Sequence, residues 1–359
     1  MQRKFLISGG GTGGHIFPAV AIAQRLEKEY PGCDILFVGA GNRMEMEKVP
    51  QEGYRIIGLD VMGLKRAISP MNLLVLWKFI RAYFKSKNIV KEFKPDCVIG
   101  TGGYASLAVL YAASGMGKKT LIWEGNGFAG LTNKLLANRV NIICTGFPDM
   151  EKVFPKQKVR FTGNPVRKTL SNIQNKIESC KFFGLDAGKP VLFITGGSLG
   201  ARSINNAIQQ GVERFAEEGI QVIWQTGKNF QADTQSKQGI LAMPFLREME
   251  YGYGAADLVI SRAGALSMSE IAVTGKPALL VPSPNVTDDH QTQNALQFCN
   301  MGASLLVRDT EVMEKLVTTA IQTLYDRKHL SSMQSKLAEV ARPNATEAIV
   351  SEIKSLIES

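Results

Sequence analysis

Two glycine-rich turns, each between a strand-like run and a helix-forming stretch, constrain this chain most. The apolar run 5–8 leads into GGGTGG at 9–14, and the apolar run 191–195 leads into GGSLG at 196–200. Because glycine has no Cβ, the backbone N–H groups of such a turn and the positive N-terminus of the next helix can face a phosphate directly. One such turn opens each half of the chain. The sequence therefore predicts two nucleotide-type folds with a cleft between them, an arrangement typical of enzymes that join two ligands.

Strand-like and helical stretches alternate along both halves. The strand-like runs of the first half lie at 5–8, 35–38, 55–59, 97–100, 120–123 and 141–145, and those of the second half at 191–195, 221–225, 240–244, 258–261, 278–281 and 304–307. Such alternation predicts parallel sheets covered by helices on both faces. The expected fold class is α/β, with two Rossmann-like parallel-sheet domains facing across a cleft.

Length and turn residues place the expected domain boundaries. A chain of 359 residues is long for one domain and suits two, each able to bury a core. The turn-rich TGNP at 162–165 divides an N-terminal domain, 1–163, from a C-terminal domain, 164–341. After the last proline an amphipathic pattern over 344–357 predicts a final helix, and we expect the segment 342–359 to pack back on the N-terminal domain.

The cysteine pattern and the hydropathy disfavour several classes of protein. Five cysteines lie far apart without a C-x-x-C pair, so we expect buried, reduced thiols and neither a disulfide framework nor a zinc site. The few residues before the first strand leave no room for a signal peptide, and no apolar run reaches the length of a transmembrane helix. Asp288-Asp289-His290 lacks a second cluster of ligands, so we expect a structural loop there, no metal and no bound cofactor.

Positive charge is concentrated in the first half. The net charge is +10, and residues 1–165 carry 23 Lys and Arg against 12 Asp and Glu, whereas residues 166–359 carry 19 against 20. Such an excess indicates an anionic partner, either nucleic acid or a membrane surface. No recognised nucleic-acid module surrounds the basic residues, so we expect no nucleic-acid partner.

A long helical stretch in this basic half bears on the choice. From Leu73 to Phe84 it is broadly apolar and includes Trp77 and Phe79, while basic residues flank it. A helix lying in the interface of an anionic bilayer has this composition. A packing helix with a solvated basic edge is the commoner explanation. A helix that buries one part of its surface and offers Trp77 or Phe84 to lipid would combine the two.

The first glycine turn matches the dinucleotide fingerprint only in part. Gly9, Gly11 and Gly14 satisfy G-x-G-x-x-G, but no carboxylate follows the second strand until Glu45. An acidic residue at that strand end normally binds the cofactor ribose, so an NAD or FAD site is disfavoured. His15, directly after the glycines, has two interpretations: a structural hydrogen-bonding residue at the helix start, or a base or diphosphate donor.

Further candidates follow other strands. A third glycine turn, GTGGYAS, lies at 100–106, and EGNG lies at 124–127. In the second half, SRAGALSMSE at 261–270 passes from strand to helix, and its small residues would let a diphosphate approach the helix N-terminus. Glu270 could accept hydrogen bonds from ribose hydroxyls, and its alternative is an ordinary glutamate on a solvated helix face.

Together these motifs resemble those of the MurG family. Between residues 8 and 295 the chain carries, in order, GGGTGGHIFPAVAIA, TGGYAS, EGNGFAGLTNKLLA, FTGNPVR, GGSLGARSINN, SRAGALSMSEI, GKPALLVPSP and HQTQNA. Each motif alone is weakly specific, whereas the ordered set is highly specific and covers nearly the whole chain. MurG enzymes transfer N-acetylglucosamine from UDP-N-acetylglucosamine to undecaprenyl-diphospho-N-acetylmuramoyl-pentapeptide (lipid I), which gives lipid II for peptidoglycan.

The resemblance implies a GT-B fold and an inverting hexosyltransferase that needs no bound metal. It places the UDP-sugar mainly on the C-terminal domain and the lipid acceptor on the N-terminal domain. The C4 hydroxyl of the muramoyl sugar would attack the anomeric carbon in line and displace UDP. Helix N-termini and glycine-turn amides would stabilise the negative charge that grows on the leaving diphosphate.

The resemblance also implies site residues, position by position. His15 is the first candidate for the base that takes the acceptor proton, and Glu124 is the second. His15 would also face the acceptor diphosphate, together with Gly102, Gly103 and Tyr104. The donor would be contacted by Thr12, Gly13, Gly14 and Asn126 from the first domain, and by Arg167, Ser198, Leu246, Arg262, Ala265, Leu266, Ser267, Met268, Ser269, Glu270 and Gln291 from the second.

Two positions depart from the family pattern. Leu199 in GGSLGA and Gly125 in EGNG stand where family members usually carry glutamine. Both lie near the sugar or phosphate of the implied site, so we expect local contacts there to be rearranged. The remaining motifs are intact, and we expect an active enzyme.

The implied partners are UDP-N-acetylglucosamine, lipid I, an anionic membrane surface reached through the region from Leu73 to Phe84, and cell-wall assembly proteins. We expect peripheral attachment at the cytoplasmic face of the plasma membrane. Two alternatives stay open: a nonhydrolysing UDP-N-acetylglucosamine 2-epimerase, which shares the twin-domain layout, and a noncatalytic scaffold that binds sugar-lipids.

Overall fold

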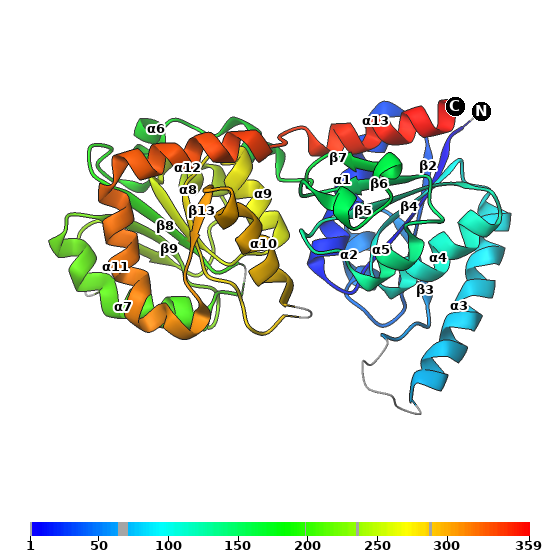
Figure 1. The fold of residues 1–359 in the computed structure, drawn as a ribbon, viewed down its shortest axis with the longest axis horizontal. Helices are drawn as coiled ribbons and strands as arrows, with labels where there is room; N and C mark the ends of the chain where they lie inside the picture. Colours follow the sequence, from blue (N-terminus) through cyan, green and yellow to red (C-terminus); the bar gives the residue numbers. More distant parts are fainter. Residues whose placement is uncertain (1, 64–70, 198, 235–236, 287–288) are drawn as a thin grey trace. The chain divides into compact units, whose positions relative to one another are not determined.

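The computed structural model describes residues 2–63, 71–197, 199–234, 237–286 and 289–359. Contacts within the chain divide it into two units, shown in Figure 1. The N-terminal unit comprises Met1–Pro165 together with Asn344–Ser359, and the C-terminal unit comprises Val166–Pro343. Each unit has its own sheet and its own hydrophobic core.

In its described residues, the N-terminal unit builds a seven-stranded parallel sheet in the order β3-β2-β1-β4-β5-β6-β7. Six of the strands match predicted runs, and the seventh was not predicted because three residues at a sheet edge carry almost no pattern. The strands are β1 (Lys4–Gly9), β2 (Asp34–Ala40), β3 (Arg55–Leu59), β4 (Cys97–Gly102), β5 (Lys119–Glu124), β6 (Ile142–Thr145) and the unpredicted β7 (Val159–Phe161).

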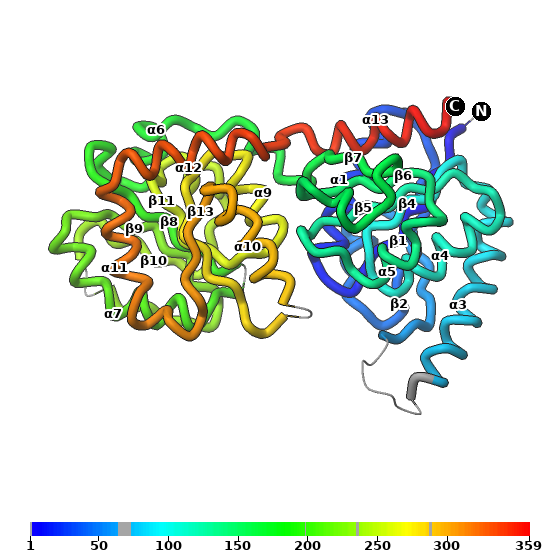
Figure 2. The backbone as a smooth tube through the Cα atoms, viewed as in Figure 1, coloured from blue at the N-terminus to red at the C-terminus, as the bar shows by residue number. Residues whose placement is uncertain are grey.

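Helices cover both faces of this sheet. One face carries α1 (Gly13–Glu29) and α13 (Ala345–Glu358), and Ile349 and Ile353 of α13 share a core with Phe5. Figures 1 and 2 show α13, in red, beside α1. The other face carries α3 (Met71–Phe93), α4 (Tyr104–Gly115) and α5 (Leu131–Leu136), and the short α2 (Glu45–Gln51) follows β2.

The described part of the C-terminal unit builds a six-stranded parallel sheet in the order β10-β9-β8-β11-β12-β13. Every strand coincides with a predicted run to within one residue, because these buried strands are nearly continuous apolar runs. They are β8 (Val191–Thr195), β9 (Gln221–Gln225), β10 (Ile240–Met243), β11 (Leu258–Ser261), β12 (Ala278–Leu280) and β13 (Ser304–Leu306). The predicted α/β class with parallel sheets is confirmed.

Helices also cover both faces of the second sheet. One core packs α7 (Arg202–Glu217), α11 (Val312–Tyr325) and α12 (Arg327–Val340) against Ile194 and Trp224. On the other face, Tyr253 meets Phe193 edge to face, with ring centroids 5.3 Å apart. The remaining helices of this unit are α6 (Lys176–Phe183), α8 (Met249–Ala255), α9 (Ala265–Thr274) and α10 (His290–Asn300).

In each sheet, the strand order changes direction beside the strand that precedes the glycine turn. In the first sheet β2 lies on one side of β1 and β4 on the other, and in the second sheet β9 and β11 flank β8 in the same way. Open parallel sheets bind ligands outside the carboxyl ends of their strands at such a switch point. The turns that follow β1, β4, β8 and β11 therefore occupy the positions where this fold favours a site.

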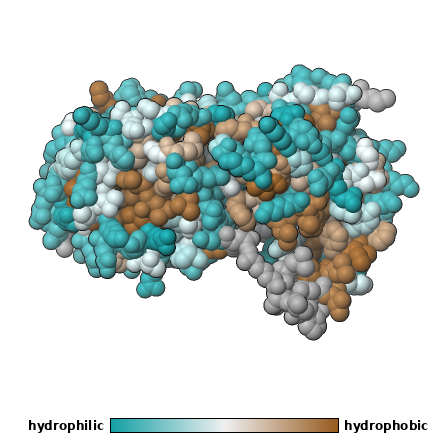
Figure 3. Space-filling model, viewed as in Figure 1, coloured by the Kyte–Doolittle hydropathy of each residue, from teal (hydrophilic) through white to brown (hydrophobic). Residues whose placement is uncertain are grey.

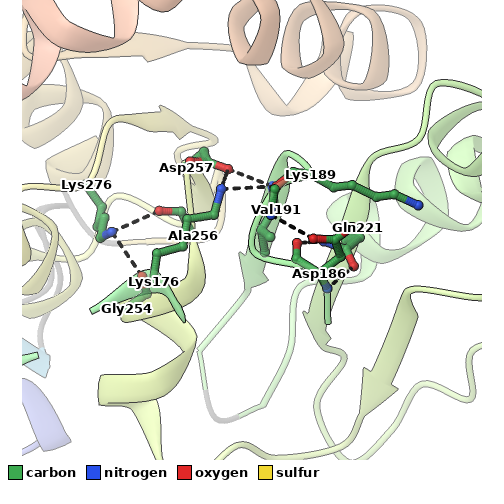
Figure 4. A network of polar contacts seen from close by, with 10 residues as sticks. Lys176, Asp186, Lys189, Val191, Gln221, Gly254, Ala256, Asp257 and Lys276 are labelled. Carbon is green, nitrogen blue, oxygen red and sulfur yellow. Dashed lines mark hydrogen bonds and ion pairs between the residues drawn. The ribbon is translucent and has the colours of Figure 1, made fainter. Parts of the chain in front are cut away.

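A polar network ties the opposite, amino ends of the second sheet (Figure 4). Asp257, just before β11, accepts hydrogen bonds from the Val191 N–H at 2.8 Å and from Lys176 Nζ at 2.7 Å. Lys276 Nζ donates to the carbonyl of Ala256 at 3.0 Å, and burial lowers the pKa of this lysine. These bonds join groups within the C-terminal unit, so we expect this end of the sheet to contribute to the stability of the unit.

The five cysteines are free thiols, as predicted, but they are not all buried. Cys97, Cys144 and Cys180 are buried, whereas Cys33 and Cys299 are partly exposed. Burial raises the pKa of Cys97 to about 12. Among the helices that the structure describes, none is long and apolar enough to span a membrane.

Candidate functional site

In the C-terminal unit, an open pocket of about 730 Å³ lies at the carboxyl ends of β8 and β11. Its lining includes the glycine turn after β8, the first turn of α7, and Gly264 and Ser267 at the start of α9. The N-cap residues of these helices, Ala201 and Gly264, provide no side-chain hydrogen bond to the first-turn N–H groups. The positive N-termini of two helices therefore lie at the pocket, where an anion is favoured.

Contact with the loop after β9 fixes the shape of this glycine turn. Gly197 and Gly200 have φ angles of 84° and 76°, and a Cβ on Gly200 would collide with the carbonyl oxygen of Thr226. Buried Gln225 donates to the carbonyl of Gly197 at 3.0 Å and accepts from the Leu246 N–H at 3.0 Å. Gln225 was not among the predicted site residues, although a polar side chain at the end of an apolar strand is a signal that could have found it.

Arg262 lines the pocket, but its charge is already paired. Its guanidinium donates to Asp309 at 2.6 Å, to Ser203 Oγ at 2.9 Å and to the carbonyl of Val281 at 3.1 Å. The side chain is only 15% exposed. The structure thus gives Arg262 the role of joining β11 to α7 and to the segment that carries Asp309.

Glu270 on α9 is enclosed rather than solvated, so its interpretation as a glutamate on an open helix face is wrong. Its side chain is 15% exposed, and Arg167 Nε lies 3.9 Å from Oε1. The Tyr253 hydroxyl donates to Oε2 at 3.2 Å. Burial raises the pKa of Glu270, and Arg167 and the Tyr253 hydrogen bond oppose that shift. Burial and the nearby Glu270 in turn raise the pKa of Tyr253 well above its ordinary value.

Gln291, another predicted donor residue, lies at the same pocket. It lines the pocket, and its Oε1 accepts the Ser283 N–H at 2.9 Å. The amide nitrogen of Gln291 is therefore the atom that a ligand would meet. Leu199 also lines the pocket and is 77% exposed. Ser198, which was predicted to contact the diphosphate, lies outside the described residues.

The start of α9 is shaped by its small residues. Ala265 and Leu266 are partly exposed, whereas Met268 is buried in the core. The Ser269 hydroxyl donates back to the Ala265 carbonyl at 3.0 Å. Met268 and Leu246 are thus both buried, although both were predicted to contact the donor.

In the N-terminal unit, the turns after β1 and β4 touch each other around His15. The Gly10 N–H donates to the carbonyl of Gly102 at 3.3 Å, and Gly102 and Gly103 have φ angles of 109° and 90°. His15 Nδ1 lies 2.9 Å from the carbonyl oxygen of Gly10. A carbonyl only accepts, so a neutral His15 ring carries its proton on Nδ1, which leaves Nε2 as the basic atom beside Gly102.

The other predicted residues of this edge lie at helix starts. Thr12 is the N-cap of α1 and gives no side-chain cap, and Gly13 and Gly14 open the helix. Gly103 is the N-cap of α4, and Tyr104, which begins that helix, is 47% exposed. His15 therefore lies in the first turn of α1, and the N-termini of both α1 and α4 lack side-chain caps.

Glu124, the second candidate base, has both carboxylate oxygens engaged. Oε2 accepts the Gly130 N–H and Asn133 Nδ2, each at 2.9 Å, and Oε1 accepts the Asn126 N–H at 3.1 Å. The residue is buried. Its geometry fits the positioning of the 125–130 loop, including Asn126, better than proton transfer.

Matches to known families cover both units. A model of the glycosyltransferase family 28 N-terminal domain matches residues 5–145, and one of the C-terminal domain matches residues 191–349. A UDP-N-acetylglucosamine--N-acetylmuramyl-(pentapeptide) pyrophosphoryl-undecaprenol N-acetylglucosamine transferase of Porphyromonas gingivalis is 46% identical over 99% of this chain and 96% of its own. That of Cytophaga hutchinsonii is 46% identical over 99% and 97%. The chain belongs to the MurG family.

Solved structures agree with this membership. The crystal structure of MurG from Acinetobacter baumannii is similar with a TM-score of 0.80 at 28% identity, and the match covers 99% of this chain and 100% of that one. The calicheamicin glycosyltransferase CalG4 (TM-score 0.73, 13% identity, 100% and 99% covered) and a UDP-N-acetylglucosamine 2-epimerase (0.63, 15%, 98% and 96%) share the fold alone. The predicted GT-B fold of two Rossmann-like domains is confirmed.

One departure from the MurG pattern has a physical reason. A Cβ at Gly125 would collide with the indole ring of Trp123, which is buried beneath the turn. A glutamine at position 125 would therefore require this ring to move. For Leu199, whose side chain is exposed, nothing in the structure explains the departure.

Proposed function

We propose that this chain is an inverting glycosyltransferase that moves N-acetylglucosamine from UDP-N-acetylglucosamine to the C4 hydroxyl of the muramoyl sugar of lipid I, giving lipid II. The observation that carries the proposal is the C-terminal pocket, where the N-termini of two helices meet without side-chain caps, in a chain that matches enzymes named for this activity along its length. The enclosed Glu270 lies on one of these helices, α9. Supply of lipid II would tie the protein to peptidoglycan synthesis, and thereby to cell shape and division.

The donor would bind in the C-terminal pocket. The first-turn N–H groups of α7 and α9 would hold the diphosphate, with Arg167 nearby, and these donors would strengthen as charge grows on the leaving UDP. Glu270 would accept hydrogen bonds from the ribose hydroxyls, and the Gln291 amide would meet the sugar. Arg262 would act indirectly, since its guanidinium holds the pocket wall.

The acceptor proton would go to His15. Its Nδ1 is oriented by the Gly10 carbonyl, which leaves Nε2 to accept the C4 hydroxyl proton as that oxygen attacks the anomeric carbon and UDP leaves. The α4 N-terminus at Gly103 and Tyr104 would receive the acceptor diphosphate. Glu124 would position the Asn126 loop instead of serving as the base.

We also propose peripheral attachment to the cytoplasmic face of an anionic membrane through α3. Leu73 and Phe84 are 73% and 58% exposed, and Arg81 stacks over the exposed Trp77 ring at 4.6 Å. In Figure 3 this part of α3 forms a brown patch. Phe79 points inward and packs against Tyr111, so the helix buries one part of its apolar surface and exposes another. Exposed apolar side chains with adjacent cations suit a bilayer interface.

Transfer of labelled sugar to a lipid I analogue tests the proposal, with Glu270→Ala and exposed Glu213→Ala assayed beside the unmodified protein. We expect lipid II and UDP from the unmodified protein and from Glu213→Ala, and at least a hundredfold lower kcat/KM from Glu270→Ala. Epimerised donor without transfer would support the 2-epimerase, and binding of both ligands without any turnover would support the scaffold.

A further inference from the structure

We propose that a second pocket, in the N-terminal unit, binds the peptide stem of the lipid acceptor, with Arg43 as the cation that pairs with a stem carboxylate. This inference rests on the proposed function. The pocket is open, has a volume of about 660 Å³ and lies beside the first glycine turn. Its lining is formed by Gly11, Asn42, Arg43, Met44, Met46 and Glu47. None of these residues takes part in the donor or acceptor contacts described above.

The buried carboxylate of Glu45 fixes this pocket to the glycine turn. Glu45 Oε2 accepts the Gly11 N–H at 3.0 Å, and Oε1 accepts the Ala40 N–H at 2.9 Å. A Cβ on Gly10 would collide with the same carboxylate. Since the Gly10 carbonyl also orients His15, the loop that carries Arg43 is held at a fixed place relative to the proposed base.

The sheet order indicates which part of the acceptor would reach the pocket. When His15 takes the C4 proton, the muramoyl sugar lies at the turn after β1. This sugar carries two arms, a diphosphate and a peptide. The proposed diphosphate site follows β4 and the pocket follows β2, and these strands flank β1 on opposite sides. The two arms would thus leave the sugar in opposite directions, with the peptide toward Arg43.

The chemistry of the pocket suits a peptide that carries carboxylates. A peptide joined through its N-terminus ends in a free carboxylate, and an arginine binds such a group through two parallel hydrogen bonds. Arg43 is exposed and has no ion pair among the residues that the structure describes. Glu47 is already engaged, because it accepts Gln51 Nε2 at 3.1 Å and lies 3.5 Å from Lys48 Nζ. The flexible side chains of Met44 and Met46 can adapt to the peptide.

Two lipid I analogues and two arginine variants test the inference. One analogue carries the full pentapeptide, and in the other every stem carboxylate is amidated. For Arg43→Gln we expect the KM of the full analogue to rise about tenfold, while kcat and the KM of UDP-N-acetylglucosamine stay within twofold. The unmodified protein should show the same tenfold higher KM for the amidated analogue, and Arg43→Gln should add nothing to it. Arg43→Lys should restore part of the loss.

The matched control is Arg55→Gln, which removes an exposed arginine paired with Asp34 in the same unit. An unchanged KM in Arg43→Gln, or an equal rise with both analogues, would overturn the stem site while transfer itself persists. An unmodified protein that transfers sugar to neither analogue would instead contradict the proposed function. An analogue that binds without turnover is compared by its inhibition constant, with the same expected ratios.

Discussion

At the scale of single residues, we expect the Glu270 carboxylate to support donor binding while it lowers the stability of the fold. Its pKa is raised by burial, so its ionisation lowers the stability of the fold, fully so at pH values above the raised pKa. This cost declines as the pH falls from the raised pKa to the unfolded pKa, where it is gone. We expect Glu270→Gln to unfold at the same or a higher temperature at pH 7, in calorimetry. The donor KM should nevertheless rise about tenfold, because a charge-assisted hydrogen bond to ribose is lost.

The pH dependence of donor binding follows from the same shift. In the unmodified protein, protonation of Glu270 should weaken donor binding as the pH falls through the raised pKa of this carboxyl, whereas Glu270→Gln should show no such step. Titration of donor affinity between pH 4 and 8 at constant ionic strength would reveal it. A step of equal size in both proteins would assign the titration to another group.

At the scale of elements, Asp257 links the starts of β8 and β11. Asp257→Ala would leave the Val191 N–H and the Lys176 ammonium without their carboxylate, so we expect the C-terminal unit to lose about 2 kcal/mol of unfolding free energy. Glu213→Ala, which breaks an exposed pair with Lys237, should change it by less than about 0.5 kcal/mol. Urea unfolding measures both. Equal effects would mean that the network contributes no more than a surface pair.

At the scale of the whole molecule, the exposed part of α3 predicts how the protein meets lipid. Trp77→Ser with Phe84→Ser should lower binding to anionic vesicles at least tenfold in a sedimentation assay, because two exposed apolar side chains are lost while the buried side of α3 is kept. Ile177→Ser, at an exposed position of the C-terminal unit, is the control and should bind normally. Undiminished binding of the double variant would contradict attachment through α3.

The sequence by itself determined the glycine turns and every strand but β7, and with them the α/β class, and its ordered motifs determined the family. Apolar runs such as Val191–Thr195 and residues without a Cβ act locally, so their consequences can be seen in a short window. It also pointed to Glu270 and His15 as candidates, because each follows a glycine- or small-residue turn.

The tertiary structure alone decided which side chains are free to act. Glu124 and Arg262 have the right chemistry for a site, but other residues already engage them. Asn133, only nine residues further along, binds Glu124, whereas Arg262 is held by Asp309 across 47 residues. Glu45 turns back to the first glycine turn, where it is joined to Gly11 across 34 residues, and Phe79 faces the core while Trp77 faces outward. A side chain's partners come from segments that meet only in the folded chain, and no local pattern specifies them.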